Sequence, residues 1–348
     1  MRLLCLLACL TLACGDDDGS TTDDPPTDGG GRDGFTADVD GFVADVDGFV
    51  PTDGGDDDPD MGPPIDPVAE AGDVMMVASS YLGDDFGFLE GPHWQGDRLV
   101  FSDLIFSTPA RQTIYALDAD DELSIVARPS EGANGSATAM DGDHITCLQA
   151  GRRVARVTAG GALETLFDRY EGDRLNAPND LVFSSSGRWY FTDPGYGVNE
   201  ADREIDIHGL YLVDGDTVTR VWDGTTSQRP NGVALSPDDA TLYLADTADA
   251  VVRAFDVGSD GTLSGERTFV PDANGADGMT VDEAGNLYVT TGSGVRVYAP
   301  DGTLWGTIDV PMTPANCAFG GADRRTLYIT ARTTLYSVAM PIPGIEGR

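Results

Sequence analysis

The sequence predicts an all-β fold, a six-bladed β-propeller with four-stranded blades around a central metal-binding channel. From residue 90 onward, short apolar segments with period-2 alternation are separated by Gly, Asp, Asn and Pro turns, as in strands. No segment shows a convincing period of 3.6 residues, which argues against helices. One unit recurs along the chain: a few apolar residues, a turn, then a strand rich in β-branched and aromatic side chains.

The spacing of these units gives the number of blades. They begin near residues 91, 136, 180, 232, 278 and 317, about 39 to 52 residues apart. Further strand-like runs lie between them, and four strands at this period are typical of a propeller blade. A pair of β-sandwiches is the structural alternative, but it does not explain the regular period. The clearest copies are Gly91–Asp103, Asp180–Asp193, Gly232–Asp246 and Gly278–Thr290.

The sixth unit is one strand short, and the segment Asp73–Ala78 is expected to supply the missing strand. Pairing the start of the chain with its last blade would close the ring. Closure removes the exposed sheet edges that otherwise invite aggregation.

The first 66 residues differ in composition from the rest of the chain. Residues 1–14 hold one arginine, then an apolar stretch and small residues, as in a secretory signal, and they resemble a bacterial lipoprotein signal with Cys14 as the lipidated cysteine. A simple secretory signal cleaved elsewhere is the alternative. Residues 15–66 hold 17 aspartates and one arginine, which predicts a disordered acidic linker. We therefore expect an exported, lipid-anchored protein of the bacterial cell envelope, periplasmic or on the outer surface.

Charge and length restrict the partners. The 348 residues carry a net charge of −38, and every basic residue is an arginine, so nucleic acid and anionic lipid surfaces are excluded. No run of 18 apolar residues exists to cross a membrane, which leaves the anchor at Cys14 as the expected membrane contact. Residues 67–344 are expected to form a monomeric propeller. Residues 345–348 spell a protease site often added to recombinant proteins and are interpreted as a tag-like tail.

Four polar residues stand just before, or at the start of, innermost strands: Glu90, Asn179, Asn231 and Asp277. Equivalent positions of successive blades converge on the channel of a propeller. Two carboxylates and two amide oxygens are hard donors that suit calcium or magnesium and leave room for water and substrate. The alternative is that each is only a turn residue, since Asn-Gly and Asp-Gly are common hairpin turns.

Other chemistries find little support. There are three histidines and no His-Glu-x-x-His zinc motif, no Gly-x-Ser-x-Gly elbow and no lysine-bearing phosphate loop. His93 follows Glu90 closely and is a candidate for the channel wall, whereas His144 lies in an alternating strand and is interpreted as structural. Cys147 and Cys317 either form a disulfide or stay as two separate buried thiols.

The sequence resembles the family of senescence marker protein, gluconolactonase and luciferin-regenerating enzyme, and most closely its bacterial gluconolactonase branch. The resemblance covers roughly residues 72–340 in family order. It is carried by Leu89–Trp94, Arg174–Leu181, Tyr190–Gly197, Arg229–Pro237, Ala276–Met279 and Asn316–Gly321.

This resemblance implies a six-bladed propeller that holds a divalent metal, most often calcium, with zinc and magnesium as alternatives. It implies Glu90, Asn231 and Asp277 as metal ligands and Asn179 as a contact to metal or substrate. A further channel asparagine of the family matches Asn134.

The expected function is a metal-dependent, gluconolactonase-like lactone hydrolase acting on a sugar or related lactone. Asp277 would take a proton from the attacking water, while Asn179 and Asn134 orient the substrate beside His93 and Tyr196. Two alternatives remain: hydrolysis of phosphotriesters or other esters at the same site, or a non-catalytic, surface-tethered binding propeller.

Overall fold

The computed structural model describes residues 64–79, 86–225 and 227–346. The expected signal, the lipidated Cys14 and nearly all of the acidic linker lie outside the described residues. No helix among the described residues is long and apolar enough to cross a membrane.

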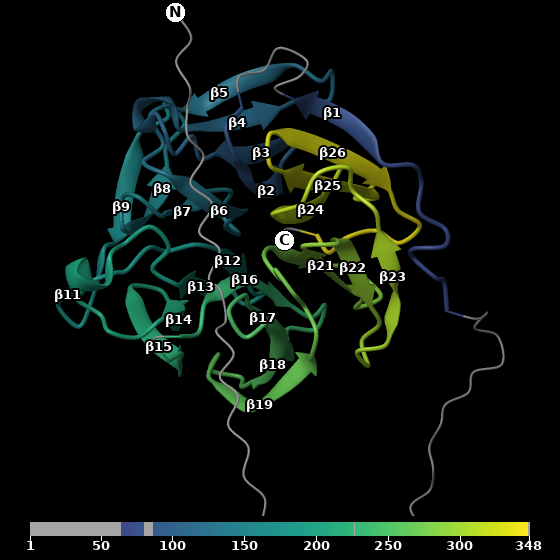
Figure 1. The fold of residues 1–348 in the computed structure, drawn as a ribbon. Helices are drawn as coiled ribbons and strands as arrows, with labels where there is room; N and C mark the ends of the chain where they lie inside the picture. Colours follow the sequence, from purple (N-terminus) through teal and green to yellow (C-terminus); the bar gives the residue numbers. More distant parts are fainter. Residues whose placement is uncertain (1–63, 80–85, 226, 347–348) are drawn as a thin grey trace, which may run out of the picture. The chain divides into compact units, whose positions relative to one another are not determined.

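Six four-stranded antiparallel sheets surround a central axis, which confirms the predicted propeller (Figure 1). The first three blades are β2 (Leu89–Gln95), β3 (Arg98–Asp103), β4 (Thr113–Leu117) and β5 (Leu123–Ala127); β6 (Ala133–Thr138), β7 (His144–Leu148), β8 (Arg153–Val157) and β9 (Leu163–Phe167); and β12 (Leu181–Phe183), β13 (Trp189–Asp193), β14 (Gly209–Asp214) and β15 (Thr217–Asp223).

The remaining blades complete the ring. They consist of β16 (Pro230–Leu235), β17 (Thr241–Asp246), β18 (Val251–Val257) and β19 (Leu263–Val270); β20 (Met279–Val281), β21 (Leu287–Thr291), β22 (Gly294–Tyr298) and β23 (Leu304–Ile308); and β24 (Asn316–Gly320), β25 (Thr326–Ala331) and β26 (Thr334–Ala339) with β1 (Met75–Ser79). Outside the blades lie the hairpin of β10 (Arg169–Tyr170) and β11 (Asp173–Arg174), and two short 3₁₀ turns at Pro109–Arg111 and Glu200–Asp202.

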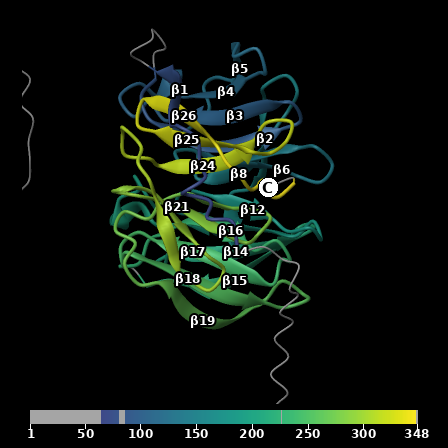
Figure 2. The ribbon, with the colours of Figure 1, turned by 90° about the vertical axis from the view of Figure 1, so that its right-hand side faces the viewer.

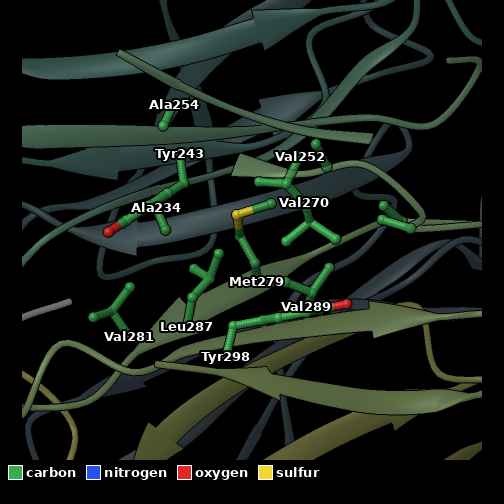
Figure 3. Packing of buried hydrophobic residues seen from close by; sticks show 13 residues of the cluster. Ala234, Tyr243, Val252, Ala254, Val270, Met279, Val281, Leu287, Val289 and Tyr298 are labelled. Atoms are coloured by element: carbon green, nitrogen blue, oxygen red, sulfur yellow. The ribbon is translucent and has the colours of Figure 1, made fainter. Parts of the chain in front are cut away.

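The place of a strand within its blade explains its composition. Every residue of β7, β13 and β21 is buried, because neighbouring blades cover both faces of these second strands. The outermost strands are less buried, and most of β19 is exposed. Apolar side chains therefore fill the spaces between blades. Figure 3 shows one such space, where Tyr243 and Val252 of the fourth blade meet Met279 and Val289 of the fifth.

The first strand of the described chain closes the ring, as expected from residues 73–78. β1 pairs antiparallel with β26, from Met75 opposite Ser337 to Ser79 opposite Thr334. Figure 2 shows the blades after a quarter turn, with β1 beside β26. A hydrogen bond of 3.0 Å between the side chains of Ser79 and Thr334 adds to this pairing.

The end of the chain reaches the channel. Gly344 forms an isolated bridge with Asp282, which follows β20, and its carbonyl accepts a hydrogen bond of 2.8 Å from Arg324. The next residue, Ile345, packs against the hydrophobic cluster of the fourth and fifth blades and lines the channel cavity. The interpretation of 345–348 as a tag stays a prediction.

Removing β1 tests this closure. A chain that starts at residue 86 leaves the edge of β26 unpaired and uncovers Leu335, so we expect a clear loss of thermal stability and more aggregation. A chain that starts at residue 64 keeps β1 and serves as the control, with an unchanged melting temperature. Equal melting of the two chains would show that β1 does not hold the ring.

Candidate functional site

Each blade contributes one polar residue where its innermost strand begins. Five of these six residues are buried, with exposed fractions of 4 to 7%, whereas Asp277 is partly exposed. Because each second strand runs antiparallel to the first, the loops after the second strands lie at the same end of the blades. The six residues are Glu90, Asn134, Asn179, Asn231, Asp277 and Asn316, which we call the polar ring.

Glycines allow the members of the polar ring to approach one another. Gly232 follows Asn231, and its N–H donates a hydrogen bond of 3.2 Å to the Asp277 carbonyl of the next blade. A Cβ at Gly232 would overlap that carbonyl, and a Cβ at Gly278 would overlap the side chain of Asn316. The polar-Gly dipeptides are therefore more than turn signals, because the missing side chain is what lets adjacent blades come together.

Hydroxyl groups of the second strands fix the spacing between blades. Ser102 donates a hydrogen bond of 3.0 Å to the Asn134 carbonyl, Thr192 one of 2.8 Å to the Asn231 carbonyl, and Thr290 one of 2.9 Å to the carbonyl of Ala315. In each case the donor belongs to one blade and the acceptor to the following blade. These buried bonds hold the backbone of the polar ring in register.

A second set of aspartates is structural. Asp103 and Asp193 end their second strands and accept backbone N–H hydrogen bonds from the segment that leads into the first strand of the same blade. Asp246 does the same for Arg229 and also pairs with Arg253 at 2.9 Å. Asp193 and Asp246 accept bonds on both carboxylate oxygens, whereas Oδ2 of Asp103 has no hydrogen-bond partner. All three hold the segment that leads into their blade, so we assign them to loop closure.

Three carboxylates lie together at the polar ring. Burial raises the pKa of Glu90 well above its usual value, and the nearby charges of Asp277 and Asp180 raise it further. Burial, followed by the charge of Asp180, raises the pKa of Asp277 to about 7. Burial also raises the pKa of Asp180 to about 7, although it accepts hydrogen bonds from the N–H groups of Leu181 and Val233. The charge repulsion on Glu90 and Asp277 means that a nearby cation would favour their ionised forms.

Amide side chains complete this arrangement. A side-chain hydrogen bond from Asn316 lowers the pKa of Glu90, and one from Asn231 lowers the pKa of Asp277. Asn231 also donates to Thr247 at 3.0 Å and to the Tyr196 hydroxyl at 3.5 Å. Tyr196 therefore lies beside the polar ring, where burial raises the pKa of its hydroxyl to about 12.

The donor set fits a hard divalent cation only when amides are included. Within the described ranges, no three His, Cys, Asp or Glu side chains are placed to hold a metal by themselves. Glu90 and Asp277 supply carboxylate oxygens, and Asn179 and Asn231 supply amide oxygens at equivalent strand starts. All-oxygen donors suit calcium or magnesium, so the residues present fit such an ion.

The other candidate residues divide between two environments. Asn134 donates a hydrogen bond of 3.0 Å to Gln149 at the end of the channel where the polar ring lies. His93 lies deeper, at a channel cavity of about 60 Å³ that Asp180 and Asn316 also line. Its role as a substrate wall stays a prediction. Cys147 and Cys317 are both buried and are not joined to each other.

Asp180 and Asn316 are site residues that sequence reasoning did not single out. Asp180 directly follows Asn179, and its side chain reaches the N–H of Val233 in the next blade. Asn316 begins the innermost strand of the sixth blade, and its side-chain oxygen accepts a hydrogen bond of 2.8 Å from Cys317. The signal that could have found Asn316 is its position, which matches that of the other ring members.

Comparison with known proteins gives consistent matches. The sequence model of the SMP-30/Gluconolactonase/LRE-like region matches residues 88–333. A gluconolactonase of Zymomonas mobilis is 31% identical over 303 residues, 77% of this chain and 82% of the relative. A pentonolactonase of Haloferax volcanii is 32% identical over 257 residues, 69% of this chain and 80% of the relative. A solved gluconolactonase from Xanthomonas campestris is 32% identical with a TM-score of 0.70, covering 79% of this chain and 91% of that one.

Two buried histidines between the first and second blades predict sensitivity to acid. The rings of His93 and His144 lie 4.8 Å apart, and none of their four ring nitrogens has a hydrogen-bond partner. Burial lowers the pKa of His93 to about 4 and lowers the pKa of His144 well below its usual value. Between pH 6.5 and 4 the unfolded chain binds protons at these two histidines that the folded chain excludes, so their contribution to the free energy of unfolding falls as pH falls. The buried carboxylates whose pKa is raised, among them Asp180 and Asp277, contribute in the opposite sense.

Replacing one of these histidines tests this prediction. His144→Leu removes a titrating group whose polar atoms are unsatisfied, so we expect equal or greater stability at pH 7.5. We also expect the melting temperature of the variant, relative to that of the unchanged protein, to rise as the pH is lowered from 7.5 to 5. A variant with the same acid sensitivity as the unchanged protein would contradict the assignment.

Proposed function

The chain belongs to the SMP-30/gluconolactonase/LRE-like family, and on this basis we propose that it is a divalent-metal-dependent lactonase that opens a sugar or related lactone. The observation that carries the proposal is the polar ring, in which the carboxylates Glu90 and Asp277 and the amides Asn179 and Asn231 stand at equivalent strand starts of different blades. Relatives that cover most of the chain are a gluconolactonase and a pentonolactonase, so the lactone of an aldonic acid is the first substrate class to test.

We assign the metal site to Glu90, Asn179, Asn231 and Asp277, with calcium as the first candidate. A divalent cation bound there would act as a Lewis acid toward the lactone carbonyl. Only 4% of Glu90 is exposed to solvent, so we assign to it the role of holding the ion. Asp277 is partly exposed, which allows it to reach a water molecule as well.

The residues of the chain then have distinct roles in hydrolysis. Asp277 accepts a proton from the water whose oxygen attacks the carbonyl carbon. The ring C–O bond then breaks, and Asp277 returns the proton to the leaving oxygen to give the hydroxy acid. Asn231 holds Asp277 through its side-chain hydrogen bond. Asn179 and Asn134 orient the lactone, and Tyr196 forms the wall on the side of the third blade. The position of Tyr196 next to Asn231 supports this role.

Asp277 provides the first test of the proposed function. We expect calcium-dependent hydrolysis of glucono-1,5-lactone that excess chelator abolishes. In Asp277→Asn, which loses a metal ligand and the base together, kcat/KM should fall by roughly 10²–10⁴-fold. Proton release, followed with a pH indicator and corrected for spontaneous opening, measures the rate.

Asp216→Asn is the matched control, because it makes the same chemical change at an exposed residue of the hairpin between β14 and β15. Its activity should equal that of the unchanged protein. Full turnover by Asp277→Asn in the presence of chelator would reject the mechanism. Turnover of phosphotriesters in place of lactones would favour the alternative esterase activity.

We further propose that the protein acts as a monomer, exported and anchored by a lipid on Cys14. The support for the anchor is the sequence of residues 1–14. The support for a monomer is that six complete four-stranded blades form from the strands of one chain. An acidic spacer between anchor and propeller would keep the catalytic domain away from an anionic surface.

Fractionation of bacterial cells tests the anchor. In Cys14→Ser the protein should leave the membrane fraction, because the thiol that carries the lipid is lost. Cys9→Ser changes another cysteine of the same segment and should leave the protein in the membrane fraction. Membrane retention of Cys14→Ser would contradict lipid attachment at this residue.

A further inference from the structure

A groove leads away from the polar ring over the first three blades. Its inner part, about 420 Å³, is lined by the loops that follow the second strands β3, β7 and β13. Its outer part, about 340 Å³, continues across the first and second blades and shares Pro109, Gln112 and Ala150 with the inner part. The combined space exceeds what one small lactone ring needs, since pockets of about 300 Å³ already bind small molecules.

Two residues connect the groove to the site. Gln149 lines the inner part and accepts the hydrogen bond from Asn134. Tyr196 lines the same part, and its hydroxyl accepts the hydrogen bond from Asn231. A molecule whose reacting group lies at the polar ring can therefore extend directly into the groove.

The lining of the groove is mostly apolar. Leu104, Phe106 and Val198 line the inner part, and Pro129 and Ala110 line the outer part. Phe106 is 64% exposed, an unusual fraction for a phenylalanine beside a functional site.

The three charged side chains of the groove are engaged with other protein groups. Glu131 pairs with Arg153 at 3.0 Å, and Asp202 accepts a hydrogen bond of 2.9 Å from Asn199. Arg152 donates hydrogen bonds to the backbone carbonyls of Leu175 at 2.8 Å and Asp202 at 3.1 Å, and so braces the loops on either side. A sugar lactone with many hydroxyl groups would find few partners along such a lining. An alkyl or aryl group would gain by leaving water.

We propose that this groove binds an apolar substituent of the substrate, so the preferred lactones carry an alkyl or aryl chain on the ring. The inference rests on the proposed lactonase function and specifies its substrate class. The lactone carbonyl lies at the polar ring, and the chain extends past Tyr196 and Phe106 toward Ala150. Hydrolysis itself is unchanged, because the substituent takes no part in bond making or breaking.

The test compares kcat/KM for δ-valerolactone, δ-octalactone, δ-decalactone and glucono-1,5-lactone with the full chain and calcium. Each added methylene should raise kcat/KM by up to about fourfold until the groove is filled. The variant Ala150→Glu places a charge in the groove and should lower kcat/KM for δ-decalactone at least tenfold. It should leave δ-valerolactone unchanged, because that substrate has no chain.

Ala240→Glu is the control, the same substitution at an exposed residue just before β17, away from the groove, and it should leave every rate unchanged. A kcat/KM that does not rise with chain length would overturn the inference while the lactonase function stands. An equal loss of kcat/KM for δ-valerolactone and δ-decalactone in Ala150→Glu would do the same. Absence of turnover for all four lactones would overturn the proposed function and this inference together.

Discussion

The close approach of six strand starts around one axis is the constraint on which the rest of this structure depends. Adjacent innermost strands come near enough for Gly232 to bond the Asp277 carbonyl, and a side chain at Gly232 would prevent this. Hydroxyl groups such as that of Thr192 fix the spacing from the second strands. β1 completes the ring, so all six starts are held in place by a continuous circle of sheets. A site built at this point has rigid support from every blade.

The rigid strand starts hold buried carboxylates in positions that are electrostatically unfavourable. The charges of Asp277 and Asp180 raise the pKa of Glu90, and the charge of Asp180 raises that of Asp277, in a place where burial already disfavours ionisation. Folding tolerates this because the carboxylates are fixed by backbone bonds and amides at rigid strand ends. Asp103 and Asp193, which are also buried, each accept hydrogen bonds from two N–H groups of their own blade. These two aspartates hold a loop, whereas Glu90 and Asp277 are the carboxylates that we propose to bind a cation.

The loops decide which molecule reaches this rigid site. The loops that follow β3, β7 and β13 form the groove beside the polar ring. They contribute Phe106, Ala150 and Tyr196, respectively. Loop residues are free to differ between relatives of one fold, since the sheets do not depend on them. The chemistry proposed for the ring and the substrate class proposed for the groove therefore have separate structural origins.

The sequence by itself determined the number of blades and the closing role of the segment that becomes β1, and it predicted Glu90, Asn179, Asn231 and Asp277 as metal ligands. These follow from a repeat period and from polar residues at equivalent positions, which are local features of a chain. Only the tertiary structure brought Asp180 to the same carboxylate group, placed His93 against His144, and joined the loops of three blades into one groove. These contacts depend on distances between blades, which cannot be read from a sequence repeat whose units lie 39 to 52 residues apart. The physical reason is that packing between sheets, and not strand propensity, fixes which side chains meet.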